Sequence, residues 1–211
     1  MKFRDLLTLV GHEPVFASAL LLAGSTPQSQ VRLQMSRWVA AGKLIQLRRG
    51  LYALAPAWRK VEPHPFVVAN ALQRGSYVSL QSALAFHGVI PEHVARVTSV
   101  GPSRSETVRN ALGSFQLNHL NSRLSFGYTR IEVAARQLAF VARPEKALLD
   151  LVYLTAGGDS TGHLASLRLQ NPDAINPDML LDLARRAGRP KLLRAARRTV
   201  ALLADERGEA P

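Results

Sequence analysis

Polar and cationic side chains gather on one segment near the N-terminus. If the segment is an α-helix, which turns about 100° per residue, these side chains lie opposite an apolar stripe made of Val31, Met35, Trp38 and Val39. They are Ser29, Gln30, Arg32, Ser36 and Arg37, with Gln28 at the N-terminal end of the segment. Arginine and glutamine each form paired hydrogen bonds with a base edge, to guanine and adenine respectively, and serine binds phosphate oxygens. The set has the chemistry to read double-stranded DNA, although a polar stripe is also typical of an ordinary solvated helix face.

A second group of cations follows in the segment KLIQLRRGLYAL, residues 43–54. Two short apolar runs flank Arg48, Arg49 and Gly50, which is typical of a β-hairpin whose turn needs glycine at positive φ. Lys43, Arg48 and Arg49 are long enough to neutralise phosphates without reading the base sequence. A basic hairpin beside the polar helix favours the DNA interpretation over the solvated face.

The distribution of charge agrees with this placement. The chain of 211 residues has a formal net charge of +12, and residues 1–60 contain nine Lys or Arg against two Asp or Glu. More than half of the net charge therefore lies in the N-terminal segment. A second basic segment, residues 185–198, has an apolar face as well, and its arginines either belong to a solvated face or form another surface for an anionic partner.

Other kinds of chemistry have little support in the sequence. The chain has no cysteine, and its six histidines are scattered without metal-ligand spacing. The glycine-rich stretch 157–162 lacks the lysine of a phosphate-binding loop, and we interpret it as a plain loop. We expect no cofactor, no metal and no enzymatic activity, an unrecognised nucleic-acid enzyme being the least favoured alternative. No signal peptide or membrane-spanning run is visible, so we expect a cytoplasmic protein.

Three helices must position the polar face and the hairpin. We expect them at residues 3–10, at Val15–Ala23, and from a cap at Ser25 or Thr26, with Pro27 just inside, to Gly42. Three helices followed by a basic hairpin is the order of a winged helix-turn-helix. We place this domain at residues 1–58 and a proline-rich linker at about residues 56–65.

The remainder, residues 64–205, predicts a mixed α/β domain with a small sheet and C-terminal helices, which makes the whole fold α+β. Helices are expected at 66–72, at 80–87, from Pro144, and after Asn176 and Arg189. Strands are expected at 77–79, 95–100, 115–120, 131–133 and 138–141. The last residues, DERGEAP, should fray.

Several segments in this order resemble the AbiEi antitoxin family. They are RRGLYAL (48–54), YVSLQSALAFHGVIPE (77–92), RVTSV (96–100), GSFQLNHL (113–120), FGY (126–128) and RPEKALLDLVYL (143–154). The resemblance covers residues 3–155. It implies an antitoxin of a type IV toxin-antitoxin, or abortive infection, system of antiviral defence that also represses its own promoter at inverted repeats. The DNA contacts would lie on the third helix, Gln28 to Arg37, and on the wing, Lys43 to Arg49.

The partners that the resemblance implies are operator DNA and a nucleotidyltransferase-like toxin encoded alongside. Two copies of the chain on DNA are expected, while a monomer in solution remains open. Two routes to neutralising the toxin also remain open. The antitoxin acts without a stable toxin complex, as the family implies, or its C-terminal domain neutralises the toxin by direct contact.

Overall fold

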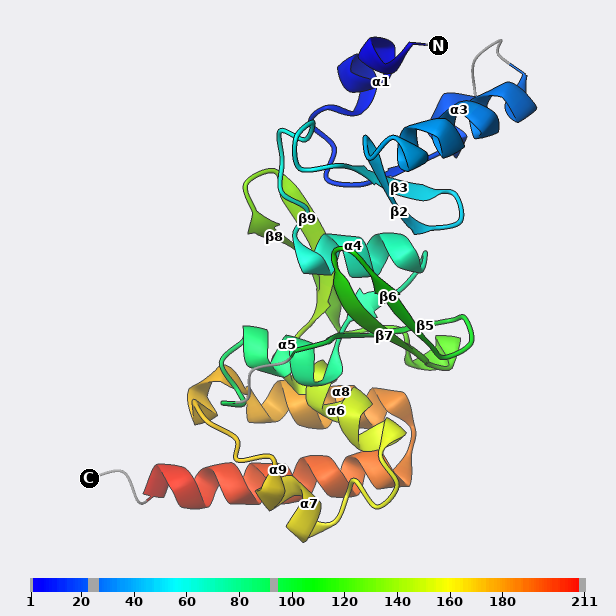
Figure 1. Cartoon of the computed structure of the whole chain (residues 1–211). Helices are drawn as coiled ribbons and strands as arrows, with labels where there is room; N and C mark the ends of the chain where they lie inside the picture. Colours follow the sequence, from blue (N-terminus) through cyan, green and yellow to red (C-terminus); the bar gives the residue numbers. More distant parts are fainter. Residues whose placement is uncertain (1, 23–26, 92–94, 209–211) are drawn as a thin grey trace.

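The computed structural model describes residues 2–22, 27–91 and 95–208 and has an α+β fold. Figure 1 shows three layers stacked along the length of the molecule: an N-terminal layer of helices with a small sheet, a central sheet, and a layer of helices that contains the C-terminal segment. The chain runs through the layers in sequence order, so the two termini lie far apart.

The N-terminal layer alternates helices with short strands. Its elements are α1 (Phe3–Val10), β1 (Phe16–Ala17), α2 (Ala19–Leu22), α3 (Gln28–Ala40), β2 (Leu44–Arg48) and β3 (Leu51–Leu54). The strands form an antiparallel sheet in the order β1-β3-β2. The apolar stripe of α3 packs with Leu6, Val10 and Phe16 into one core cluster, where Met35 is 1% exposed and Trp38 is 5% exposed.

The predicted second helix, Val15–Ala23, is wrong over its first half. Phe16 and Ala17 are extended and pair with Tyr52 and Leu51 of β3. The Phe16 side chain is buried in the core cluster and stacks on the Tyr52 ring, and this long-range packing overrides the local helix propensity. Pro27 caps α3 from outside the helix, while Ser25 and Thr26 lie outside the described residues.

The central sheet has six strands and is larger than predicted. Its order is β6-β7-β5-β4-β9-β8, with mixed parallel and antiparallel pairs. The strands are β4 (Tyr77–Val78), β5 (Val97–Gly101), β6 (Glu106–Asn110), β7 (Gly113–His119), β8 (Tyr128–Ala134) and β9 (Gln137–Ala142). The sequence reading missed β6 because this edge strand, ETVRN, is half exposed and has no apolar run.

Helices flank this sheet and form the third layer. They are α4 (Pro65–Leu72), α5 (Leu80–Phe86), α6 (Pro144–Leu154), α7 (Thr161–Ser166), α8 (Pro177–Ala187) and α9 (Pro190–Gly208), with 3-10 turns at Ser122–Leu124 and Pro172–Ala174. Helix α7 begins inside the predicted loop, because Ser160 accepts a hydrogen bond from His163 N–H and caps it. Helix α9 continues through residues 205–208, where fraying was expected.

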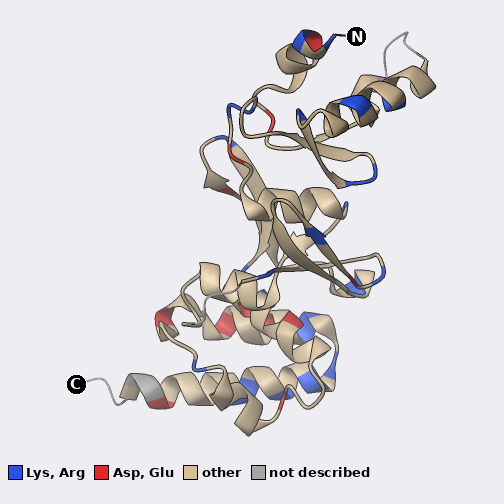
Figure 2. Ribbon diagram, viewed as in Figure 1, with Lys and Arg blue, Asp and Glu red and all other residues tan. Residues whose placement is uncertain are grey.

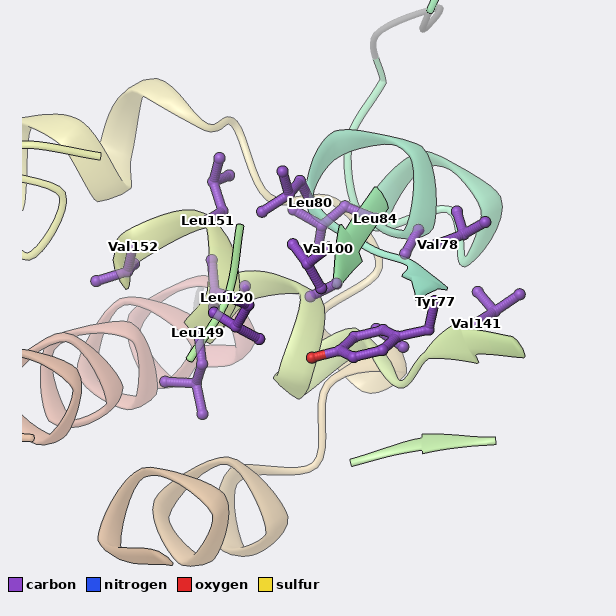
Figure 3. Close-up of a cluster of buried hydrophobic side chains, with 14 of the residues drawn as sticks. Tyr77, Val78, Leu80, Leu84, Val100, Leu120, Val141, Leu149, Leu151 and Val152 are labelled. Carbon is purple, nitrogen blue, oxygen red and sulfur yellow. The ribbon is translucent and has the colours of Figure 1, made fainter. Parts of the chain in front are cut away.

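A large apolar core joins the central sheet to the helices, and Figure 3 shows part of it. Side chains of β4, β5 and β9 meet those of α5 and α6 there, including Val78, Leu84, Val141 and Leu149. Leu47 and Leu51 of the β2–β3 hairpin also belong to this core. The hairpin therefore packs on the body of the protein as well as on the N-terminal layer.

A polar cluster is enclosed within this core. Asp150 of α6 accepts hydrogen bonds at Oδ2 from the Tyr77 hydroxyl (3.0 Å) and the Ser79 hydroxyl (2.8 Å). Its Oδ1 pairs with the Lys146 ammonium. The four residues are at most 2% exposed. Burial raises the pKa of the Asp150 carboxyl, against the opposing effects of Lys146 and the two hydroxyls, and burial together with Asp150 raises the pKa of Tyr77.

Asp150→Ala should lower the free energy of unfolding by about 3–5 kcal/mol, because it leaves the Lys146 ammonium buried without a counter-charge. Urea unfolding of the full chain measures the effect. A double variant, Lys146→Met with Asp150→Leu, should recover most of the loss. Asp182→Ala is the control, since it removes an exposed ion pair with Arg185 and should cost less than about 1 kcal/mol. Equal effects of Asp150→Ala and Asp182→Ala would contradict this account.

Candidate nucleic-acid interface

Helix α3 and the β2–β3 turn face each other across a cleft of about 470 Å³. Arg32 of α3 and Arg49 of the turn both line it. The remaining lining residues are Ser18, Val31, Met35, Gly50 and Tyr52. Two cations from elements that are separate in sequence thus share one concave surface.

The turn is held beside α3 by the chain that precedes it. The Ser18 N–H donates a hydrogen bond of 2.8 Å to the Gly50 carbonyl, next to the β1–β3 pairing. Gly50 has φ of +81°, a conformation that favours glycine, and a Cβ atom at this position would lie 3.5 Å from the Ser18 hydroxyl. The backbone that carries Arg49 is consequently held at the rim of the cleft.

The outer face of α3 is polar and open to solvent, as its spacing predicts. All six of the side chains singled out in the sequence are exposed: Gln28, Ser29, Gln30, Arg32, Ser36 and Arg37. Within the described part of the chain, Arg32, Arg37 and Arg49 form no ion pair. Figure 2 shows these cations on α3 and at the tip of the hairpin. The arrangement leaves their charge available to an anionic partner.

Arg48 has a different surrounding from its neighbour Arg49. Its guanidinium forms an ion pair of 2.9 Å with Glu106 of β6 and donates to the Leu72 carbonyl of α4 at 2.8 Å. The Asn110 amide also donates to the Leu47 carbonyl at 3.4 Å. Arg48 was predicted as a phosphate contact; its side chain is 42% exposed, and its ion pair and hydrogen bond join the hairpin to the central sheet.

The Lys43 side chain packs against aromatic rings of the protein. Its ammonium lies 4.9 Å from the centre of the Phe3 ring and 5.8 Å from the Trp58 ring, and the side chain is half-buried. Cations over aromatic faces contribute attraction within the fold. Of the three hairpin cations proposed from sequence, Arg49 alone lines the cleft.

Several C-terminal cations also bind within the protein. Lys191 donates to the Thr155 carbonyl at 2.6 Å, and Arg194 pairs with Asp159 at 2.9 Å and thereby lowers the pKa of that carboxyl. The Arg186 guanidinium lies 4.3 Å from the centre of the Phe126 ring. The contacts of Lys191 and Arg194 bind the loop after α6 to α9, and that of Arg186 joins α8 to the segment before β8, so part of the basic C-terminal face serves the fold.

A group of reactive side chains also lies inside the core. The buried cluster around Asp150 contains a hydroxyl, a carboxylate and an ammonium, but all three are enclosed by the core. In residues 2–22, 27–91 and 95–208 no group of three or more His, Asp or Glu side chains could hold a metal ion. A search of the same residues finds no helix long and apolar enough to cross a membrane.

Comparisons with known proteins give no family. No protein-family model and no curated protein matches the sequence. Among solved structures, the chain is similar to the crystal structure of the RV2827C protein from Mycobacterium tuberculosis. That similarity has a TM-score of 0.49 and 16% sequence identity, and covers 94% of this chain and 79% of the other.

The two adjacent arginines should differ in their effect on stability. Arg48→Ala should lower the free energy of unfolding by about 1–2 kcal/mol, because the Leu72 carbonyl and Glu106 lose a charged partner. Arg49→Ala should change it by less than about 0.5 kcal/mol. Urea unfolding of both variants, with Glu106→Gln and the Arg48→Ala/Glu106→Gln pair, completes a double-mutant cycle. Additive losses from Arg48 and Glu106 would show that the ion pair contributes nothing.

Proposed function

We propose that residues 1–58 form a winged helix-turn-helix that binds double-stranded DNA, and that the protein represses its own promoter at inverted repeats. One observation carries the proposal: Arg32 of α3 and Arg49 at the hairpin turn share one cleft, and neither has an ion-pair partner in the described chain. Such an arrangement suits a helix that reads base edges beside a wing that holds the backbone.

The dimensions of α3 support this mode of binding. An α-helix with its side chains is about 10–12 Å in diameter. The major groove of B-DNA is about 12 Å wide and admits an α-helix. The buried stripe of Val31, Met35 and Trp38 fixes which side of α3 faces outward.

Each cation then has a separate task. Arg32 and Arg37 read base edges together with Gln28 and Gln30, while Ser29 and Ser36 hold phosphates. Arg49 holds a phosphate from the wing. Lys43 and Arg48 support the position of the hairpin, Lys43 through its aromatic contacts and Arg48 through its surface ion pair with Glu106.

The antitoxin role is the second part of the proposal, and the resemblance of the sequence segments to the AbiEi family supports it. The chain would counter a nucleotidyltransferase-like toxin encoded in the same operon. Direct neutralisation through residues 64–205 is the alternative. The alternative requires a stable complex of the two proteins, whereas the family's mode of action does not. Co-purification of the two gene products distinguishes between them.

Arg49→Ala should weaken binding to the upstream DNA and to a scrambled duplex by similar factors, because a phosphate contact carries no sequence information. The slope of log K against log salt concentration should become shallower by about 0.9. A mobility shift at several salt concentrations measures both quantities. Arg197→Ala, an exposed cation on α9, is the charge-matched control. If Arg49→Ala binds as the unmodified protein does, the wing has no place in DNA binding.

Arg32→Ala and Arg37→Ala should act on sequence preference. Each should cost about 1–3 kcal/mol on the upstream DNA if it removes a contact with guanine, and less on the scrambled duplex. Competition binding between the two duplexes gives the ratio of affinities. A uniform loss on both would mean that α3 contacts only the backbone, and no selective binding by the unmodified protein would remove the repressor proposal.

A further inference from the structure

A second cleft, of about 490 Å³, lies between α1 and the segment that follows β3. It shares no lining residue with the cleft between α3 and the hairpin turn. Its polar and aromatic lining consists of Arg4, Thr8, His12, Trp58 and Lys60. None of the lining residues is acidic, so the cleft presents positive charge.

The two cations have hydrogen-bonding capacity to spare. The Lys60 ammonium lies 3.3 Å from Nε2 of His12. This contact uses one of the three N–H donors of the ammonium. Arg4 is exposed, and its guanidinium forms no ion pair or hydrogen bond among the interactions of the described residues. Both side chains can therefore donate to the oxygens of an anion.

Trp58 adds an aromatic surface to the same cleft, and the Lys43 ammonium lies 5.8 Å from its ring centre. The Trp58 side chain is 40% exposed, whereas Trp38 is 5% exposed. The Phe3 ring meets Trp58 at 84°, with the ring centres 5.1 Å apart, and holds it in place. Exposed aromatic rings beside cations are the combination on which nucleobases stack while their phosphates are bound.

The dipole of α1 accounts for only part of this arrangement. A helix C-terminus attracts cations, and His12 and Lys60 lie near the end of α1. Arg4 is in the first turn of α1, where the dipole disfavours a cation. Neither effect requires Trp58 to remain exposed in the same cleft. A ligand that is both anionic and aromatic accounts for all three side chains together.

We propose that this cleft binds a nucleoside phosphate, with the phosphate held by Arg4 and Lys60 and the base stacked on Trp58. The ligand is a free mononucleotide or one nucleotide of a single strand, which share this chemistry. The site is separate from the proposed duplex-binding surface and does not depend on it.

Tryptophan fluorescence of the full chain tests the proposal, because a base stacked on Trp58 should quench its emission. The probes are adenosine monophosphate, adenosine, inorganic phosphate and a six-nucleotide oligothymidylate. We expect the nucleotide to quench emission with a lower Kd than adenosine, and Trp58→Phe to abolish the quenching. Arg4→Ala and Lys60→Ala should each raise the Kd about tenfold. If adenosine monophosphate saturates the quenching and the oligonucleotide binds no more tightly, the ligand is a free nucleotide. If the oligonucleotide binds more tightly than the mononucleotide, the ligand is a single strand.

A matched control separates the site from general charge attraction. Arg197→Ala should leave the Kd for the nucleotide unchanged, and thermal unfolding should show that every variant is folded. The proposal is overturned if no probe binds, if quenching survives in Trp58→Phe, or if Arg197→Ala weakens binding as much as Lys60→Ala does. Inorganic phosphate that binds as tightly as the mononucleotide, measured by competition, would overturn the stacking of a base.

Discussion

The buried carboxylate of Asp150 constrains the arrangement of the central sheet and the helices. It binds Lys146 one turn away on α6, Tyr77 on β4, and Ser79 immediately after β4. Leaving any of these groups unpaired in the apolar core would be costly, so α6 can dock on β4 in only one register. The same contact fixes the turn into α5, where Leu80 has φ of +58° and needs support from its surroundings.

The position of the hairpin follows from that of the sheet. Strand β4 pairs with β5, β5 with β7, and β7 with the edge strand β6. Glu106 and Asn110 of β6 then hold Arg48 and the Leu47 carbonyl of β2. A continuous series of hydrogen-bonded elements therefore connects the core to the turn that carries Arg49. The orientation of the cleft beside α3 is thus set by contacts outside the N-terminal layer as well as within it.

Local patterns were sufficient to predict α3, the hairpin and α6, because each has a clear period or a defined turn. Strand β1 has two residues and β6 is polar, so both exist only through partners far along the chain. The sequence also could not separate Arg48 from Arg49. Successive residues in a strand point to opposite faces, but which face meets Glu106 depends on a register that shifts between Gln46 and Arg48. The pairing of Lys146 with Asp150 was missed because their helical spacing is equally common on exposed faces.

The cations that give the chain its net charge of +12 fall into groups with different roles. Arg48, Lys146 and Arg194 each pair with a carboxylate of the protein and therefore add little to the outward field. Arg32 and Arg49 line one cleft, Arg37 is exposed on the same helix as Arg32, and Arg4 and Lys60 line another cleft. Only cations that neutralise phosphates release counterions on binding, and only these contribute to the salt dependence of the affinity. The number of cations with open surroundings, rather than the total charge, therefore sets how strongly the N-terminal layer can hold nucleic acid.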